Sequence, residues 1–153
     1  MRNEDKYLPV VATAFARQGL PPELGCAIAR QESNWDPTAT ATNPKDIAMG
    51  GAFGLCQMTL DTARALGHAD ITPAQLHDPA INASLAAELC AANLKRLAPG
   101  RSVYDCAADL LAMYNSGRVL AKAPHITQTN YVPRAMGFMS AYAARCASYA
   151  VCT

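Results

Sequence analysis

Glu32 carries the carboxylate best placed for acid–base chemistry. It follows Leu24 and Ile28 at steps of four residues, so the three side chains project from one face of a helix that we predict over residues 22–33. If Leu24 and Ile28 face the core, Glu32 lies at the core's edge, where the loss of water favours the neutral carboxyl and raises its pKa. Such a carboxyl can donate a proton to a leaving oxygen. The alternative is a helix-end glutamate that simply extends into water.

Five further residues are suited to binding a polar ligand: Ser33, Gln57, Tyr114, Asn115 and Tyr131. The amide of Gln57 offers donors and acceptors to hydroxyl and acetamido groups, and Tyr131 offers a ring for stacking and a hydroxyl. Ser33 either orients the acid or the ligand, or only ends the helix. We expect Tyr114 and Asn115, at the end of a later helix, to reach the same cleft. The Tyr114 hydroxyl is expected to come closest to the acid.

A long segment rich in turn-forming residues separates the acid from Gln57. It covers residues 34–53 and ends beside Gly50, Gly51 and Gly54. A loop of this length in a compact protein is usually functional. Glycine also lets the backbone approach a ligand closely. We therefore expect this segment to form part of a binding groove.

The elements that must position these residues are helical. Alanine is abundant whereas Val, Ile, Phe and Trp are few, which favours helices over strands. Apolar spacing and capping residues predict helices over residues 5–18, 22–33, 59–67, 78–98 and 102–117 and from residue 131 onward. The sequence therefore predicts an all-α fold of six or seven helices in a single domain spanning residues 1–153.

Three details of these helices can be compared with a structure. Pro9 is expected in the first turn of its helix, where a missing N–H is tolerated. Ile81, Leu85 and Leu89 form a stripe at steps of four residues that we expect to be buried. The serine and aspartate at the ends of residues 102–105 have the spacing of a capping box.

Composition excludes several classes of function. Hydrophobic residues make up 51% of the 153 residues and charged residues 16%, which argues against disorder. A net charge of +1 without a basic run gives no electrostatic basis for binding nucleic acid. No apolar stretch approaches the length of a membrane span, which is about 20 residues. A polymer ligand would therefore be held by a groove rather than by bulk charge.

The six cysteines suggest either disulfides or buried thiols that act as small hydrophobic side chains. Cys146 and Cys152 could staple a C-terminal tail if they were oxidised. There is no CxxC motif, and the histidines show no metal-ligand spacing relative to the cysteines. We therefore expect no metal and no cofactor.

The N-terminal residues 1–10 lack the apolar core of a signal peptide, which indicates a removed leader or another route such as lysis or carriage in a virus particle.

Four motifs stand in order along the chain: "QES" at 31–33, "GAFGLCQM" at 51–58, "AMYNSG" at 112–117 and "TQTNYV" at 127–132. This order resembles the soluble lytic transglycosylases and, more distantly, the goose-type lysozymes. Their shared pattern is Glu-Ser, Gly-Leu-Met-Gln, Ala-Tyr-Asn-Ala-Gly, then Glu-Thr and Tyr-Val. The similarity also includes the "DP" and "N" that follow His77, and covers roughly residues 15–135. The chain departs from the pattern at Cys56, Ser116 and Gln128, which stand where the family usually has methionine, alanine and glutamate.

The resemblance implies a lysozyme-like fold and cleavage of peptidoglycan. The family cuts the β-1,4 bond between N-acetylmuramic acid and N-acetylglucosamine and leaves a 1,6-anhydromuramoyl end. Glu32 would act first as acid and then as base on the muramoyl 6-hydroxyl, so that no second carboxylate is needed. Ser33, Gln57, Tyr114, Asn115 and Tyr131 would bind the glycan. The implied partner is the peptidoglycan strand, and we expect a monomer without nucleic acid or a membrane span.

Two alternatives remain open at this point. A goose-type muramidase would hydrolyse the same bond with a second group that activates water. Asp46 and Asp61 lie near the corresponding places but do not align with them, and we interpret them as a loop residue and a first-turn helix residue. The other alternative is a catalytically silent wall-binding module, against which the intact Glu32 argues. The resemblance implies a protein of the cell envelope or periplasm, or a secreted or phage-delivered one.

Overall fold

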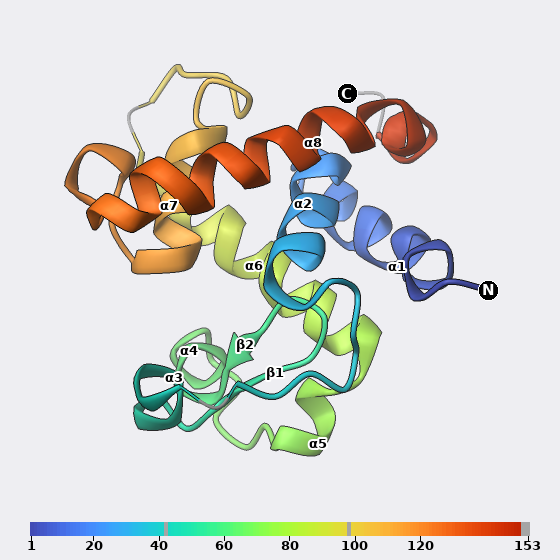
Figure 1. The fold of residues 1–153 in the computed structure, drawn as a ribbon, viewed down its shortest axis with the longest axis vertical. Coiled ribbons are helices and arrows are strands. Elements are labelled where there is room, and N and C mark those ends of the chain that lie inside the picture. The colour runs from blue at the N-terminus through green and yellow to red at the C-terminus, as the bar shows by residue number, and fades with distance from the viewer. Residues whose placement is uncertain (42, 98, 151–153) are drawn as a thin grey trace.

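The protein is described by a computed structural model that covers residues 1–41, 43–97 and 99–150 (Figure 1). In these residues eight α-helices account for most of the structure. They are α1 (Asn3–Arg17), α2 (Pro22–Ser33), α3 (Pro44–Ala48), α4 (Leu60–Ala65), α5 (Pro73–Leu76), α6 (Pro79–Lys95), α7 (Ala107–Ser116) and α8 (Val132–Cys146). Two short strands, β1 (Ala52–Phe53) and β2 (Met58–Thr59), pair antiparallel. The predicted all-α fold is confirmed.

Three shorter helical turns complete the secondary structure of the described residues. They are the 3₁₀ turns η1 (Leu120–Lys122) and η3 (Ala147–Tyr149), and the π-helical turn η2 (Thr127–Tyr131). The turn η2 leads directly into α8. No helix in the described part of the chain is long and apolar enough to cross a membrane.

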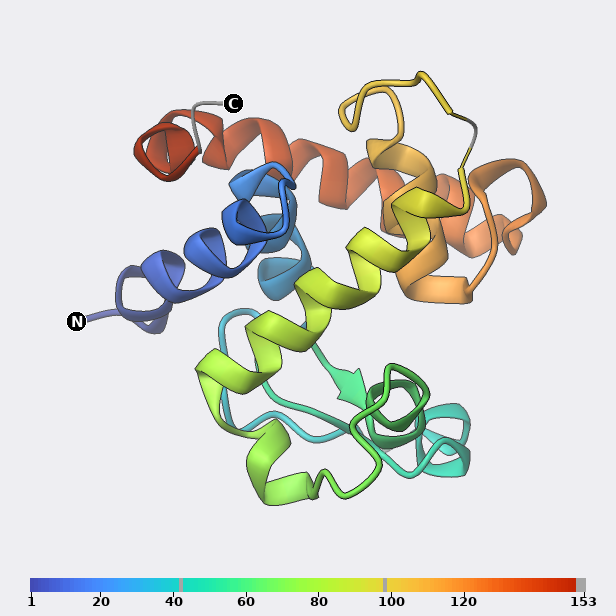
Figure 2. The ribbon, with the colours of Figure 1, turned by 180° about the vertical axis from the view of Figure 1, so that it is seen from behind.

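The helices form two regions joined by α6. Helices α1, α2 and α8 pack against one another at one end, while the β1–β2 hairpin lies with α3, α4 and α5 at the other (Figure 1). Seen from behind, α6 runs from the hairpin region to α7 (Figure 2). The C-terminal end of α2 reaches the junction of the two regions, so its last turn lies beside both (Figure 1).

The apolar faces predicted for the first two helices are buried. Leu8, Val11 and Phe15 of α1 pack into the core, and so do Leu24 and Ile28 of α2, which are both fully inaccessible to solvent. Glycine at position 25 lets the two helices approach closely, because a Cβ there would lie 2.3 Å from the Phe15 ring, a distance that real Cβ atoms do not tolerate. Since Leu24 and Ile28 face the core, Glu32 lies at the core's edge as expected.

The two helices that the sequence did not predict are α3 and α5. Each starts with a capping residue followed by proline: Asn43 accepts a hydrogen bond from the Asp46 N–H, and Thr72 forms a capping box with Gln75. Helices of five and four residues are too short to show a helical periodicity of apolar residues. The predicted loop over residues 34–53 is therefore interrupted by a helix.

Three expectations about helix details are met only in part or not at all. Pro9 lies well inside α1 because the helix already starts at Asn3. Leu85 of the predicted stripe is buried as expected, but Ile81 is 36% exposed, because the buried face of α6 is shifted toward Asn82, Ala83 and Ala86. Residues 102–105 do form the reciprocal hydrogen bonds of a capping box, but the helix α7 begins only at Ala107.

The five cysteines of the described residues are reduced and buried. The suggested pairing of Cys146 with Cys152 falls outside the described residues. A different pair is close in space: the Sγ atoms of Cys26 in α2 and Cys146 in α8 lie 3.4 Å apart. These thiols are within van der Waals contact and need only a small movement to reach the bonding distance of about 2.05 Å.

We expect Cys26 and Cys146 to form a disulfide when the protein is treated with oxidised glutathione. The two thiols lose two protons and two electrons, and the oxidant becomes two molecules of reduced glutathione. The cross-link closes a long loop, so the melting temperature should rise by roughly 4–16 °C and return to its original value with dithiothreitol.

Peptide mapping by mass spectrometry without reduction checks this expectation. Because trypsin leaves residues 146 and 152 in one peptide, the experiment should use a Cys152→Ser background. The Cys146→Ala variant in the same background should lose the cross-link. Oxidation that links any other pair of cysteines would show that the 3.4 Å contact between Cys26 and Cys146 is only packing.

Candidate active site

Glu32 lies in the last turn of α2, where the chain reverses through an unusual backbone conformation. The two residues that follow the end of α2, Asn34 and Trp35, have φ angles of 54° and 67° in the left-handed region. Such a conformation is uncommon for an aromatic residue and is retained only when the surroundings enforce it. Here Trp35 is 1% exposed, and its indole N–H donates to the Tyr142 hydroxyl at 2.9 Å. Trp35 therefore anchors the helix end that carries Glu32.

The Glu32 carboxyl is partly buried, and this burial raises its pKa to about 7. The hydroxyl of Tyr131 donates a hydrogen bond to Oε1 of Glu32 and lowers the pKa, because it favours the charged form. The nearby charge of Asp46 raises the pKa, and the charge of Lys45 lowers it. The net result is a carboxyl that is protonated in a substantial fraction of molecules near neutral pH.

Glu32 faces a cleft of about 520 Å³. The cleft is lined by Arg30, Gln31, Glu32, Ser33, Asn34, Ala39, Thr40, Gln57, Arg134 and Phe138. Among the described residues that line it, Glu32 carries the one carboxylate. The structure thus brings Glu32, Ser33 and Gln57, three of the residues predicted from the sequence, to one cleft.

Ser33 fixes the end of α2 against the turn that precedes β2. Its Oγ donates to the Leu55 carbonyl at 2.7 Å and accepts from the Asp36 N–H at 3.0 Å. These bonds hold the backbone on either side of the catalytic candidate, and Ser33 also lines the cleft. These contacts are the ones expected of a residue that ends the helix, and a role of Ser33 in orienting the acid or the ligand stays a prediction.

The turn that carries Gln57 is held rigidly from behind by Asn82. The Asn82 side chain is fully buried, accepts from the Cys56 N–H at 2.8 Å and donates to the Phe53 carbonyl at 2.7 Å. Gly54 is required in this turn because a Cβ there would lie 2.4 Å from the Leu76 carbonyl oxygen. Gly54 therefore serves close packing within the protein, and the close approach of the backbone to a ligand stays a prediction.

Gln57 itself adopts a left-handed backbone conformation, with φ at 49°. Its Nε2 donates to the carbonyls of Ala39 and Gly54, both at 3.1 Å. These bonds fix the amide plane where it lines the cleft. The strained residues Asn34, Trp35 and Gln57 thus all lie at or beside the cleft, a distribution typical of functional sites.

The tyrosine that contacts the acid is not the one that we expected. The hydroxyl that contacts Glu32 belongs to Tyr131, whereas the Tyr114 hydroxyl donates to the Cys56 carbonyl at 2.7 Å. The expectation that Tyr114 comes closest to the carboxyl was therefore wrong. Tyr131 is only 8% exposed, so its ring packs in the core and is not available for stacking. It reaches the acid from the last residue of the π-helical turn η2, which leads directly into α8, the helix that packs against α2.

Asn115 does not line the Glu32 cleft. Its Oδ1 accepts from the Thr127 hydroxyl at 2.8 Å, and its backbone carbonyl accepts from Nζ of Lys45 at 3.3 Å. It therefore ties the end of α7 to η2 and to α3. Through these contacts Asn115 supports the turn that carries Tyr131, and a glycan contact by Asn115 stays a prediction.

Several cleft residues carried no signal in the sequence. These are Arg30 of α2, Asn34 directly after α2, and Arg134 and Phe138 of α8, and the two helices meet only in the folded protein. Asn82 could have been identified, because it lies within the motif-bearing stretch after His77, but its role as a buried bridge depends on three backbone groups from other elements.

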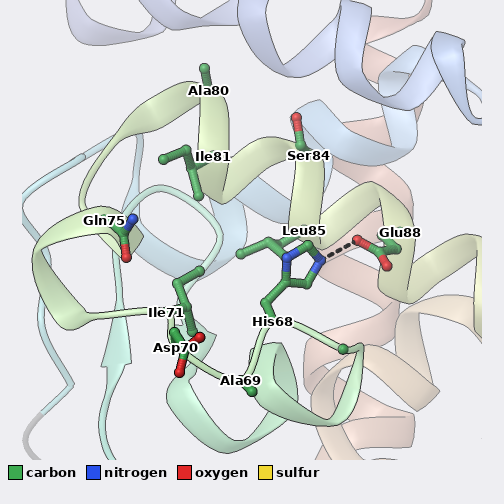
Figure 3. Close-up of a pocket in the computed structure, with 11 residues that line it drawn as sticks. His68, Ala69, Asp70, Ile71, Gln75, Ala80, Ile81, Ser84, Leu85 and Glu88 are labelled. Carbon is green, nitrogen blue, oxygen red and sulfur yellow. Dashed lines mark hydrogen bonds and ion pairs between the residues drawn. The ribbon is translucent and has the colours of Figure 1, made fainter.

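A second hollow of about 650 Å³ lies between the α4–α5 connection and the outer face of α6 (Figure 3). Its main titratable groups are His68 and Glu88, whose side chains contact each other at 2.9 Å and are both more than one-third exposed. The two side chains therefore already bind each other, and water reaches both of them. The chemistry therefore points to the Glu32 cleft, although that cleft is the smaller one.

No group of three or more histidine, cysteine or acidic side chains within residues 1–41, 43–97 and 99–150 is arranged to hold a metal ion. Asp46 and Asp61, the two aspartates considered as water-activating bases, belong to the first turns of α3 and α4. Neither lines the cleft that contains Glu32. Asp46, interpreted from the sequence as a loop residue, is thus a helix residue, and its carboxylate accepts from the Asn43 amide.

Comparison with known proteins identifies a family for most of the chain. The family model described as the transglycosylase SLT domain matches residues 9–130, which include all four motifs apart from the last two residues of the fourth. No curated protein matches the chain.

We expect Glu32→Gln to stabilise the protein at pH 8 but not at pH 4. The raised pKa means that the folded state keeps a proton that the unfolded state releases between about pH 4.5 and 7, so the wild type loses stability as the pH rises through this range. Glutamine stays neutral throughout. The free energy of unfolding of the variant, relative to wild type, should therefore be higher at pH 8 than at pH 4 by roughly 1–3 kcal/mol.

Urea unfolding of both proteins at the two pH values measures this difference. Asp61→Asn, at an exposed position, serves as a control that should change the stability by less than about 0.5 kcal/mol. Equal effects of Glu32→Gln at both pH values would mean that the carboxyl is fully hydrated in the folded protein.

Proposed function

Because the chain belongs to the transglycosylase SLT domain family, we propose that it is a peptidoglycan lytic transglycosylase with Glu32 as its one acid and base. The observation that carries this proposal is the cleft with a single carboxylate whose pKa is raised to about 7. The substrate bond is the β-1,4 link between N-acetylmuramic acid and N-acetylglucosamine. The products are an N-acetylglucosamine end and a 1,6-anhydromuramoyl end.

In the first step Glu32 acts as the acid. It transfers its proton to the glycosidic oxygen as the bond from that oxygen to C1 of the muramoyl residue breaks. Partial burial keeps the proton on the carboxyl near neutral pH, and positive charge develops at C1. The acetamido group of the substrate can stabilise that charge, so the protein need not provide a second carboxylate.

In the second step the same carboxylate acts as the base. The 6-hydroxyl of the muramoyl residue attacks C1 and gives its proton to Glu32, which restores the starting form of the protein. The hydrogen bond from the Tyr131 hydroxyl stabilises the carboxylate between the two steps. Tyr131 is thus a positioning residue, which holds one oxygen of Glu32 while the proton leaves and returns.

Gln57 and Ser33 complete the site on the hairpin side. Gln57 lines the cleft with its amide fixed by two backbone carbonyls, so it presents a rigid polar group to glycan hydroxyl or acetamido groups. Because peptidoglycan is the polymer of the cell wall, the protein would act at the cell wall. We propose action in the envelope or after secretion, with delivery by a phage as an alternative.

We expect Glu32→Gln to abolish lysis of purified peptidoglycan while leaving the fold intact. General acid catalysis contributes roughly 10²–10⁴-fold, which sets the expected loss of turnover. Turbidity clearance of purified sacculi gives the rate, and circular dichroism checks the fold. Mass spectrometry of the wild-type products should find 1,6-anhydromuramoyl ends. More than about one-tenth of the activity in the variant would contradict the assignment.

Asp46→Asn and Asp61→Asn distinguish the transglycosylase from a hydrolase. Neither aspartate lines the cleft, so both variants should keep most of the wild-type turnover. A collapse of turnover in Asp46→Asn, together with reducing ends in the wild-type products, would identify a muramidase that uses Asp46 to activate water. Binding to sacculi without any product would identify a silent wall-binding module.

Tyr131→Phe should move the alkaline limb of the pH–rate profile. The acid must be protonated, so the rate falls as the pH rises through the pKa of Glu32. Since the Tyr131 hydrogen bond lowers that pKa, its removal should shift the limb to higher pH and also lower the maximal turnover. Tyr114→Phe is the matched control, because its hydroxyl bonds the Cys56 carbonyl instead. A shifted limb in Tyr114→Phe and none in Tyr131→Phe would reverse the roles assigned here.

A further inference from the structure

The cleft has a second wall, formed by two arginines and a phenylalanine, for which the cleavage chemistry has no use. Arg30 belongs to α2, and Arg134 and Phe138 belong to α8, the helix that packs against α2 (Figure 1). Arg134 and Phe138 are four residues apart, so they share one face of α8. The guanidinium of Arg30 lies 5.6 Å from the centroid of the Phe138 ring. All three side chains line the same cleft as Glu32.

The positive charge on this wall is largely uncompensated. In the described part of the chain, Arg134 has no carboxylate within 4.0 Å, and it is exposed. Arg30 reaches Glu4 only at 4.0 Å, and Glu4 is already bonded by Arg145. The Asn34 amide oxygen, which also accepts from Arg30, is neutral. The wall therefore presents two guanidinium groups to the cleft and retains an excess of positive charge.

A neutral glycan has no charged group that could pair with the two guanidinium groups, but a muramoyl residue can carry one. Its sugar ring carries a lactyl ether at O3, which ends in a carboxyl group or is joined to a peptide stem that has free carboxylates. The muramoyl residue is also the sugar whose C1 must lie beside Glu32. Its O3 substituent must therefore leave the ring within the same cleft, where a planar guanidinium can bind a carboxylate with two hydrogen bonds.

We propose that Arg134, assisted by Arg30, binds a carboxylate on the O3 substituent of the muramoyl residue. This inference rests on the proposed function only for the identity of the glycan, and it makes the site selective for strands with an anionic substituent. Phe138 holds Arg30 at the wall through its ring face and limits the access of water to the guanidinium. Arg134 is then a specificity-determining residue that takes no part in proton transfer.

The test measures binding, so that it does not depend on catalysis. Calorimetry in a Glu32→Gln background compares Arg134 with Arg134→Gln and Arg134→Lys on three soluble probes. These are peptide-bearing glycan strands, strands whose stems were removed by an amidase so that only lactyl carboxylates remain, and neutral chitin oligosaccharides. Arg17→Gln, at an exposed position at the end of α1 and outside the cleft, is the matched control.

We expect Arg134→Gln to weaken binding of peptide-bearing strands roughly three- to tenfold, the range for a partly exposed charge pair. Arg134→Lys should recover part of the loss, because lysine keeps the charge but not the planar fork. Binding of chitin oligosaccharides should not change. A loss that persists on the amidase-treated strands identifies the lactyl carboxylate, and a loss that disappears there identifies a stem carboxylate.

An equal loss on all three probes, or no loss on peptide-bearing strands, would overturn the inference. These outcomes differ from a failure of the proposed function, which would appear as a wild-type protein that forms no anhydromuramoyl product. In that case selective, Arg134-dependent binding would still support a site for the anionic glycan substituent.

Discussion

The site depends on the placement of one carboxyl group at the boundary between core and cleft. Leu24 and Ile28 draw their face of α2 into the core, so Glu32, one turn further on, loses part of its hydration. Its pKa therefore rises to about 7, where the same group can act as acid and as base. The neighbouring features either hold this carboxyl in position or adjust its charge.

Position is enforced from both sides of the cleft by contacts that are distant in sequence. On the helix side, Trp35 is buried in a left-handed conformation and bonded to Tyr142, which fixes the end of α2. On the hairpin side, Asn82 satisfies backbone groups of the turn that carries Gln57. The two sides are joined by the Ser33 hydroxyl, which bonds the Leu55 carbonyl. The strain at these turns is offset by buried hydrogen bonds.

Electrostatics divides the cleft into two functional parts. Around Glu32, desolvation and the charge of Asp46 raise the pKa of the carboxyl, whereas the Tyr131 hydroxyl and the charge of Lys45 lower it. The resulting pKa is about 7. Further along, Arg30 and Arg134 leave a positive wall that suits an anionic substituent. A net charge of only +1 on the whole chain hides this local asymmetry. Recognition of a polymer by a groove, rather than by bulk charge, is consistent with both features.

The sequence by itself determined the local features. Helix periodicity placed Leu24, Ile28 and Glu32 on one face, and the proline and capping signals located six of the eight α-helices in the described residues. It also identified the residue that lines the cleft from the hairpin, Gln57. The helix predictions follow from interactions within a few residues, which composition and spacing report directly, whereas Gln57 was identified through its place in a motif that resembles the family pattern.

Only the tertiary structure decided which tyrosine serves the acid and what forms the opposite wall. Tyr114 and Tyr131 are equally suited by type, and the π-helical turn that directs Tyr131 to Glu32 has no sequence period by which to predict it. Arg134 became part of the cleft because α8 packs across α2, a contact between residues about a hundred positions apart. A sequence pattern reports which face of a helix is apolar, but the partner of that face is chosen by the packing of the whole chain.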